Sequence, residues 1–480
     1  MINDRQFFIT KDPVAGFEDW KKIDLHKDYT LHYHTGLNIA YQDKDILLLG
    51  YAWQVDPNRK SPQEELQAFS HHSNYSHEDV FEIEKTWCGR YLLIVGEWIY
   101  TDACGFLGVF FDERIVTSSL NVLCTLEGRE MIFPDISHRR MPDFVPGIRT
   151  PYSNVIRLLP SQLLNYTTKE TCTRPLLIDK APEYSSEEDR IKDVVNHFVY
   201  SIQNFSKLFS DHQIWLAVTA GRDSRATLAC FEKAQVNFST FTLWHNNISQ
   251  PDCIIPRRLA KALHRPYRFI KRDESHFSQK RYEDYKIHTT GMAVDADWQL
   301  YAYNQFQALQ EAQRKIVIVR NGVWEIASDY YRALFGDKCN DLTTLYPGIL
   351  NNKFFYNSTM EWKENIVEKD KNNTQMSFID RIYWDLREGC WLSSVEQSFD
   401  MMDDITSIQI ANSRLIISLL YGFTQQDRIR KIHEEKIATS ICPEFTKIPY
   451  DYQYETVKQK IRKYGSRIKK TIKSFFRKKS

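Results

Sequence analysis

Apolar positions in the first third of the chain fall into short runs separated by turn signals. From Leu31 to about Leu164 such runs recur, as in LHYHTGLNIAYQDKDILLLGYAW and RYLLIVGEWIYTDACG. Short apolar runs bounded by turn residues are typical of β-strands. The pattern therefore predicts a β-rich first domain, which we place at residues 1–180.

After a polar stretch at 180–190 the pattern changes to longer segments. Strand-like runs such as QIWLAVTA and KIVIVRNG alternate with helix-like runs, which favours an α/β layer with parallel strands. Between about 376 and 443 apolar residues recur at spacings of three and four, the helical period. We predict a parallel-sheet domain with a helical extension at 190–445, so that the fold class combines α+β and α/β parts.

Composition narrows the class of protein. The 480 residues are 42% apolar and 26% charged, as in ordinary water-soluble proteins of two or three domains. No apolar run approaches the roughly 20 residues that span a bilayer, and no signal peptide is visible. Nine scattered cysteines without a CxxC pair indicate reduced structural thiols. We expect a cytoplasmic protein.

The last segment of the chain differs from the rest in charge. Residues 457–480 hold 11 Lys or Arg and no acid, whereas the other residues hold 52 basic and 62 acidic ones. One helical stripe of this tail (446–480) is apolar and consists of Ile461, Tyr464, Ile468, Ile472, Phe475 and Phe476. A basic amphipathic helix can lie on an anionic membrane, which would make the protein peripheral on the inner membrane face. A nucleic-acid contact and a solvated terminus are alternatives, although the body has no basic patch and nucleic acid is not an expected partner.

The segment from Trp215 to Leu228 carries the clearest candidate chemistry. An apolar strand runs into a small-residue turn and then into a helix expected to begin near Asp223. Ala220 and Gly221 leave room for a nucleotide to approach the backbone, and a helix N-terminus favours an anion. Such a turn can hold phosphate, with hydroxyl donors nearby from Thr219 and Ser224.

Asp223 adds a metal to this hypothesis. A carboxylate repels bare phosphate, so its place at an anion site makes sense if it holds Mg²⁺ that bridges to the phosphates. Strand–turn–helix junctions with Gly and a capping Asp also occur for structural reasons alone. That structural interpretation stays open on these residues.

TAGRDSR resembles the S-G-G-x-D-S pyrophosphate loop of asparagine synthetases and related ATP pyrophosphatases. Further similarities follow in the family's order: the strand at 237–244, Asp252 ahead of a helix, and RNGVWEIASDYY at 320–331. The resemblance implies a PP-loop domain that uses ATP and Mg²⁺. It implies these nucleotide-binding residues: Thr219, Ala220, Gly221, Arg222, Asp223, Ser224, Arg225, Leu243 and Gly322.

The resemblance also implies catalytic and metal-binding residues. Glu325 is in register with the family's G-E-G-x-D-E loop, whereas Trp324 stands where the family has a metal-binding aspartate. Either Glu325 takes that role, giving Asp223 and Glu325 as metal ligands, or one metal contact is missing. Lys431 stands twelve residues before Pro443, the spacing of the family's catalytic lysine. A solvated helix lysine is the alternative.

The β-rich part resembles the glutaminase domain of asparagine synthetases, in segments such as CGRYLLIV and TPYSNVIRLLPSQLL. The resemblance implies a β-sandwich of the Ntn-hydrolase type. In that family an N-terminal cysteine attacks glutamine, but the second residue here is Ile2, which has no nucleophilic atom. We expect a degenerate domain without glutamine hydrolysis.

These expectations lead to three hypotheses of function. The leading one is an ATP-dependent ligase that adenylates a carboxylate and transfers it to ammonia or an amine, with Glu325 and Lys431 as catalytic residues. The carboxylate would be a small molecule or lipid-linked, as in modification of surface polysaccharides or peptides. A conventional asparagine synthetase that uses ammonia, and a non-catalytic scaffold that keeps the fold, are the alternatives.

Overall fold

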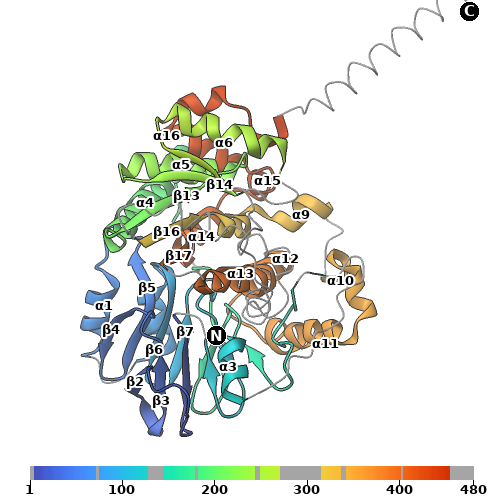
Figure 1. Ribbon diagram of the computed structural model, residues 1–480. Coiled ribbons are helices and arrows are strands. Elements are labelled where there is room, and N and C mark those ends of the chain that lie inside the picture. The colour runs from blue at the N-terminus through green and yellow to red at the C-terminus, as the bar shows by residue number, and fades with distance from the viewer. Residues whose placement is uncertain are drawn as a thin grey trace, which may run out of the picture.

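The computed structural model describes residues 5–71, 75–127, 142, 144–178, 182–243, 249–270, 315–336, 342–401 and 404–453. Its strands form two antiparallel sheets and one parallel sheet (Figure 1). The β-rich first part and the parallel α/β second part agree with the sequence prediction. Ile2 and the basic tail at 457–480 lie outside the described residues.

The first domain contains two six-stranded antiparallel sheets. In spatial order, the first sheet is β10 (Ile156–Arg157), β8 (Phe110–Phe111), β9 (Val116–Thr117), β1 (Phe7–Thr10), β3 (Thr30–Tyr33) and β2 (Lys21–Asp24). The second is β12 (Thr171–Thr173), β11 (Gln162–Asn165), β7 (Trp98–Thr101), β6 (Trp87–Val95), β5 (Ile46–Gln54) and β4 (Ile39–Asp43). The strands β1 and β2 precede Leu31, where the predicted β-region began.

The two sheets pack face to face. One apolar cluster joins Phe7 and Leu31 of the first sheet to Leu49, Leu92 and Leu164 of the second. Helices α1 (Pro62–Phe69) and α2 (His77–Glu84) cover the outer face of the second sheet, and α3 (Leu120–Glu127) lies outside the first. The predicted β-sandwich is therefore present, with helices outside both sheets, while its assignment to the Ntn-hydrolase type stays a prediction.

The second domain is built on a five-stranded parallel sheet. Its spatial order is β15 (Tyr267–Ile270), β14 (Ser239–Leu243), β13 (His212–Ala217), β16 (Lys315–Arg320) and β17 (Ile405–Gln409). Alternate residues of β13 face opposite sides of the sheet, so that Ile214 and Leu216 pack beneath helices and Trp215 packs on the other face. The helices on the first side are α4 (Glu187–Leu208), α5 (Arg222–Ala234) and α6 (Gln250–Ala262).

The predicted helical extension contains helices and one strand. Its elements are α11 (Lys353–Trp362), α12 (Phe378–Arg381), the π-helical stretch η7 (Ile382–Leu392), α13 (Ser393–Ser398), α14 (Arg414–Tyr421), α15 (Gln425–Ile429) and α16 (Ile432–Ile441). The strand β17 lies between α13 and α14 and was not predicted. Shorter pieces are η3 (Gly322–Ser328), α9 (Tyr330–Phe335), α10 (Leu342–Leu345), η9 (Pro443–Lys447) and η10 (Asp451–Gln453).

Buried polar contacts fasten this extension to the first domain. The Arg90 guanidinium donates to both carboxylate oxygens of Asp400 at 2.8 and 2.6 Å, and both side chains are buried. Ser161 Oγ donates to Asp385 at 2.8 Å. Because an unpaired buried charge is costly, these pairs fix how the two domains meet.

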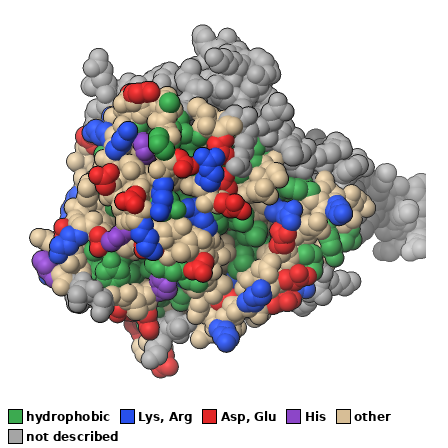
Figure 2. Space-filling view, turned by 90° about the horizontal axis from the view of Figure 1, so that it is seen from below, with side chains coloured by type: hydrophobic (Ala, Val, Ile, Leu, Met, Phe, Trp, Pro, Cys, Tyr) green, Lys and Arg blue, Asp and Glu red, His purple; other side chains and the backbone are tan. Residues whose placement is uncertain are grey.

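Charges on the surface are mixed. On the face seen in Figure 2, basic and acidic side chains of the described residues are interspersed, without a continuous basic patch. No helix of the described residues combines the length and the apolar character needed to cross a bilayer. Neither observation tests the predicted role of the tail.

Candidate functional site

The parallel sheet has one point where its strand order reverses. From β13 the chain moves outward through β14 to β15, and it then returns to place β16 on the other side of β13. Ligands of open parallel sheets bind beyond the carboxyl ends of the strands at such a point. A cavity of about 250 Å³ lies there, between the segments that follow β13 and β16.

This switch-point cavity is lined by residues at the ends of three strands, β13, β14 and β16, and at the starts of α5, α6 and η3. Its lining residues are Ala217, Val218, Thr219, Asp223, Ser224, Phe241, Thr242, Leu243, Asp252, Arg320, Asn321 and Gly322. Five of the residues predicted for nucleotide binding are among them: Thr219, Asp223, Ser224, Leu243 and Gly322. Asn321 Nδ2 donates to the Ala217 carbonyl at 2.8 Å and so ties the two strand ends together.

The bend from Thr219 to Gly221 turns the chain from β13 into α5. Its three amide N–H groups all have acceptors within the protein. Thr219 N donates to Ser224 Oγ at 3.1 Å, Gly221 N to Thr219 Oγ1 at 3.2 Å, and Ala220 N to Asp252 Oδ1 at 2.7 Å. The hydroxyls of Thr219 and Ser224 thus accept from two amides of the bend, and the Asp252 carboxylate of α6 accepts from the middle one.

Asp223 stands in the first turn of α5, where the helix was expected to begin. A Cβ on Gly221 would lie 2.6 Å from Asp223 Oδ1, so a larger residue there would push this carboxylate from its place beside the bend. Burial and, less strongly, the nearby Glu325 carboxylate raise the pKa of Asp223 to about 6, against the lowering effect of Lys431. Asp223, Glu325 and Lys431, far apart in the sequence, are therefore close enough to interact.

Lys431 is ion-paired rather than solvated. Its Nζ lies 2.5 Å from Glu325 Oε1, with both side chains mostly buried. Its left-handed backbone, at φ 52°, starts α16. Burial lowers the pKa of Lys431, but the carboxylates of Glu325, Glu434 and Asp223 outweigh burial and raise it above its usual value. The interpretation as a free surface lysine is not supported by this contact.

Glu434 belongs to the same cluster and was not predicted. It is fully buried and accepts a hydrogen bond from Ser328 Oγ at 2.8 Å. Burial raises the pKa of Glu434 to about 8, with Asp223 and Glu325 adding to the shift. The available signal was its position one helical turn after Lys431. Three acids thus surround one lysine, so the cluster favours an added cation.

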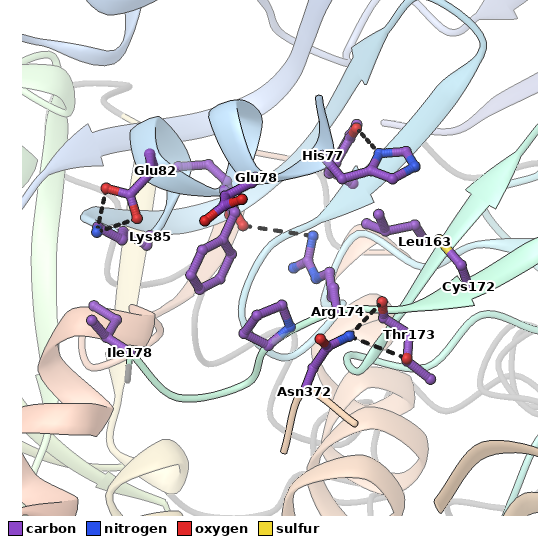
Figure 3. Close-up of a pocket in the computed structure, with 14 residues that line it drawn as sticks. His77, Glu78, Glu82, Lys85, Leu163, Cys172, Thr173, Arg174, Ile178 and Asn372 are labelled. Atoms are coloured by element: carbon purple, nitrogen blue, oxygen red, sulfur yellow. Dashed lines mark hydrogen bonds and ion pairs between the residues drawn. The ribbon is translucent and has the colours of Figure 1, made fainter. Parts of the chain in front are cut away.

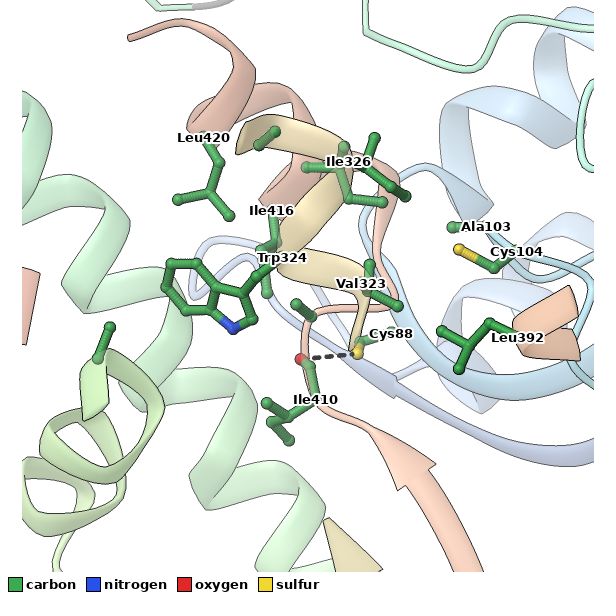
Figure 4. Packing of buried hydrophobic residues seen from close by; sticks show 14 of the residues in the cluster. Cys88, Ala103, Cys104, Val323, Trp324, Ile326, Leu392, Ile410, Ile416 and Leu420 are labelled. Carbon is green, nitrogen blue, oxygen red and sulfur yellow. Dashed lines mark hydrogen bonds between the residues drawn. The ribbon is translucent and has the colours of Figure 1, made fainter. Parts of the chain in front are cut away.

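Trp324 lies in the core, away from the switch-point cavity. Its ring is fully buried and stacks on Phe198 with centroids 4.8 Å apart, and Figure 4 shows it packed near Ile416 and Leu420. The neighbouring Gly322 donates its N–H to Gln409 Oε1 at 2.8 Å. In this segment Glu325 is the residue whose side chain contacts Lys431 and lies close enough to Asp223 to influence its pKa.

The structure places two of the predicted nucleotide-binding arginines elsewhere. Arg225 is fully buried, donates to the carbonyls of Ile448 and Pro449 at 2.8 Å, and stacks on Tyr450 at 3.7 Å. Arg222 pairs with Glu435 and stacks on a tyrosine ring. Neither lines the switch-point cavity. Residues 446–453 therefore pack against the body, although they were expected to begin the tail.

Ala220 also differs from the expectation of an open turn. The residue is fully buried in the apolar core, and its N–H donates to Asp252 of α6. The Ala220 carbonyl accepts from Asp451 N at 3.3 Å. The C-terminal segment thus contacts the bend directly, which no local pattern in the sequence indicated.

The cluster of Asp223, Glu325 and Lys431 fits Mg²⁺ only if phosphate oxygens supply part of the metal's ligands. Among the described residues no group of three His, Cys, Asp or Glu side chains is arranged to hold a metal. Glu325 Oε2 is nevertheless buried without a hydrogen-bond partner. Mg²⁺ in proteins commonly takes one or two carboxylates and completes its shell with phosphate and water. Asp223 and Glu325 would supply the protein's share.

A larger cavity, of about 750 Å³, lies in the first domain between α2 and β12 (Figure 3). His77 Nδ1 and Tyr100 Oη are 2.7 Å apart there, and Lys85 pairs with Glu82 at 2.6 Å. The buried Arg174 donates to the Thr101 carbonyl at 2.6 Å and lies 3.7 Å from Glu84. We call this the first-domain cavity.

The first domain offers no reactive thiol near an N-terminal position. Cys88 is fully buried, and its Sγ–H donates to the Ile410 carbonyl at 3.3 Å. Burial raises the pKa of this thiol well above its usual value. The eight cysteines in the described part are thiols that form no disulfide bond, as expected from their spacing.

Comparisons with known proteins give weak similarities. No family model matches the chain, and no curated protein matches it. Among solved structures it is similar to an NMN synthetase from Francisella tularensis, at 14% identity and a TM-score of 0.20 over 30% of this chain and 58% of that one. It is also similar to a glutamine-dependent NAD⁺ synthetase from Acinetobacter baumannii, at 12% identity and 0.21 over 35% and 30%.

A third similarity is to a U34-tRNA thiolase from Methanococcus maripaludis, at 11% identity and a TM-score of 0.22 over 57% of this chain and 87% of that one. The chain thus spans less than two thirds of the NMN and NAD⁺ synthetases. Likenesses this weak decide neither fold nor function. Both depend on the topology and the side chains described above.

Proposed function

We propose that the protein is an ATP-dependent ligase that adenylates a carboxylate and transfers the acyl group to ammonia or an amine. The observation that carries the proposal is the convergence of Asp223, Glu325 and Lys431 beside a cavity at the switch point of a parallel sheet. Three chain segments more than one hundred residues apart supply these groups. A purely structural turn would not require them to meet.

Each residue has a role that its chemistry supports. The bend and the hydroxyls of Thr219 and Ser224 would hold the leaving pyrophosphate. Asp223 and Glu325 would hold Mg²⁺, which neutralises phosphate charge when bound. Lys431, freed from its pair with Glu325, would place an ammonium group against the negative charge that builds on the α-phosphate.

The reaction balances in two steps. A carboxylate oxygen of the substrate bonds to the α-phosphorus, and the bond to pyrophosphate breaks. The nitrogen of the amine then bonds to the acyl carbon, AMP leaves, and the nitrogen loses a proton. Since Ile2 offers no glutaminase nucleophile, the amine would arrive as free ammonia, from a partner protein, or on a larger substrate, and lipid-linked carboxylates remain within the proposal.

Exchange of labelled pyrophosphate into ATP tests the first step. With Mg²⁺, ATP and a panel of carboxylates, the full-length protein should catalyse exchange with at least one of them. A conventional asparagine synthetase would do so with aspartate and would form asparagine from ammonia. Exchange with other carboxylates but not aspartate would favour a larger substrate.

A non-catalytic binding protein is the competing function. One observation favours it: the amides of Thr219, Ala220 and Gly221 are all satisfied by the protein itself. Such a protein would show neither exchange nor magnesium-dependent ATP binding. Calorimetric titration of MgATP into the full chain distinguishes the two functions without knowledge of the substrate.

A further inference from the structure

Asp252 holds one of the bend's amides from a different element. It stands in the first turn of α6, and its Oδ1 accepts from Ala220 N at 2.7 Å. Its other oxygen accepts from Ser249 Oγ at 2.5 Å, and its own N–H donates back to that hydroxyl at 3.2 Å. The carboxylate is therefore fixed on both sides, against the bend and against the cap of α6.

The charge of Asp252 is not balanced by a close cation. Among the described residues its carboxylate accepts hydrogen bonds from Ala220 N and Ser249 Oγ and forms no ion pair, and Asp223 adds a second carboxylate to the same cavity. Arg320 also lines the cavity, but its guanidinium is already paired with Glu396. A bare phosphate at this cavity would therefore face two carboxylates and an arginine that is already paired.

An incoming phosphate and Asp252 would compete for the same donor. A backbone amide has one hydrogen, so Ala220 N–H cannot fully serve both acceptors. A phosphate oxygen at this amide must displace a carboxylate that is already held by Ser249. A cation that accompanies the phosphate offsets the repulsion from Asp252 and Asp223 and gives the displaced carboxylate a partner.

We propose that Asp252 is a specificity-determining residue, a built-in competitor that makes the bend accept metal-complexed polyphosphate and reject free phosphate anions. The proposal rests on the proposed function, because it assigns the ligand class of that same site. It goes beyond phosphate binding by the bend in predicting which form of the anion binds. It also explains why a cavity that takes phosphate would be lined by two acids, Asp223 and Asp252.

The test compares two probes by calorimetry on the full-length protein: inorganic pyrophosphate in EDTA and the same anion with excess Mg²⁺. We expect the wild type to bind the magnesium form more tightly. In Asp252→Asn the metal-free affinity should rise about tenfold, since one repulsive charge is removed. The magnesium form should change less, so the ratio of the two affinities should shrink.

Asp252→Ala serves as a second variant, because asparagine can still accept from Ala220 N. Ser249→Ala is the matched control: it removes the hydroxyl partner and keeps the charge, so the discrimination should persist. Thermal unfolding checks that each variant is folded.

An unchanged ratio in both Asp252 variants, with wild-type binding of magnesium pyrophosphate intact, would overturn the role of Asp252 and leave the proposed function standing. Equal loss of both affinities would show instead that Asp252 only shapes the bend. If the wild type binds neither probe, the proposed function and this inference both fail.

Discussion

Two cavities in the described part of this protein differ in how their charged side chains are balanced, and the larger of the two is not the better candidate site. The first-domain cavity is about three times larger, at about 750 against 250 Å³. Its charged side chains are paired locally: Lys85 with Glu82, and Glu84 with Tyr91 Oη at 2.9 Å and two arginines. Beside the switch-point cavity, three acids share one lysine.

This difference separates a structural network from a candidate site. A buried network whose charges pair with one another stabilises one packing of the domain. A cluster with surplus like charge beside an opening retains chemistry that a ligand can complete. We therefore expect changes in the first-domain cavity to affect folding, and changes at the switch point to affect ligand binding and turnover.

The largest effect is expected from Lys431→Met. Removing the ammonium group takes away the one cation among Asp223, Glu325 and Glu434, so pyrophosphate exchange should fall about 1,000-fold, in the range seen for lost transition-state donors. Lys436→Met, on the same helix but half exposed beside Glu187, is the control and should retain exchange. Equal activity in both variants would contradict the catalytic role of Lys431.

Glu84→Gln should lower the stability of the protein and leave its exchange activity unchanged. The change leaves Arg174 and Arg414 without their shared carboxylate in a buried place, which should lower the free energy of unfolding by about 3 kcal/mol. Denaturant titration measures this loss. Exchange per folded molecule should stay at the wild-type rate, and a fall in that rate would show that the first domain contributes directly to the chemistry.

A smaller effect should appear in the pH dependence of stability. Burial raises the pKa of Glu434 to about 8, so between its unfolded pKa, near 4.5, and 8 the folded state binds more protons than the unfolded state. Its contribution to the free energy of unfolding must then fall as pH rises, by at most about 1.4 kcal/mol per pH unit. Glu434→Gln should flatten the decline between pH 5 and 8, measured by denaturant titration at a series of pH values.

The smallest effect is expected from filling the larger cavity. Ile178→Trp adds an aromatic ring at its wall. Because no group of the proposed reaction lies there, MgATP binding measured by calorimetry should stay within about twofold of the wild type. A marked loss of binding would mean that the two cavities are coupled, and the contrast between them would no longer hold.

Local patterns in the sequence were sufficient for the strands that flank the site. The apolar runs at β13, β14 and β16 and the start of α5 are where we expected them, because continuous apolar segments and a small-residue turn are local signals. The strand β17 was missed because ITSIQ is short and stands among helices. β1 and β2 were missed because they precede the clear alternation that begins near Leu31.

Side-chain direction could not be predicted in the same way. Arg225 and Asp223 stand two residues apart in the loop motif, yet one is held by Pro449 and Tyr450 and the other lies beside the bend. A helix rotates successive residues by about 100°, so neighbours in a motif face different partners. The contact of Asp252 with Ala220 links two elements and has no local signal at all.

The packing of the last described residues has a consequence for where the protein would work. Asp451 N–H reaches the bend, and Tyr452 lies over the Arg222 guanidinium at 4.1 Å. The basic segment at 457–480 therefore starts no more than six residues, or about 22 Å of extended chain, after Asp451, which contacts the bend. Under the proposed function, a membrane that captured this segment would be held close to the switch-point cavity, where a lipid-linked carboxylate could react without leaving the membrane.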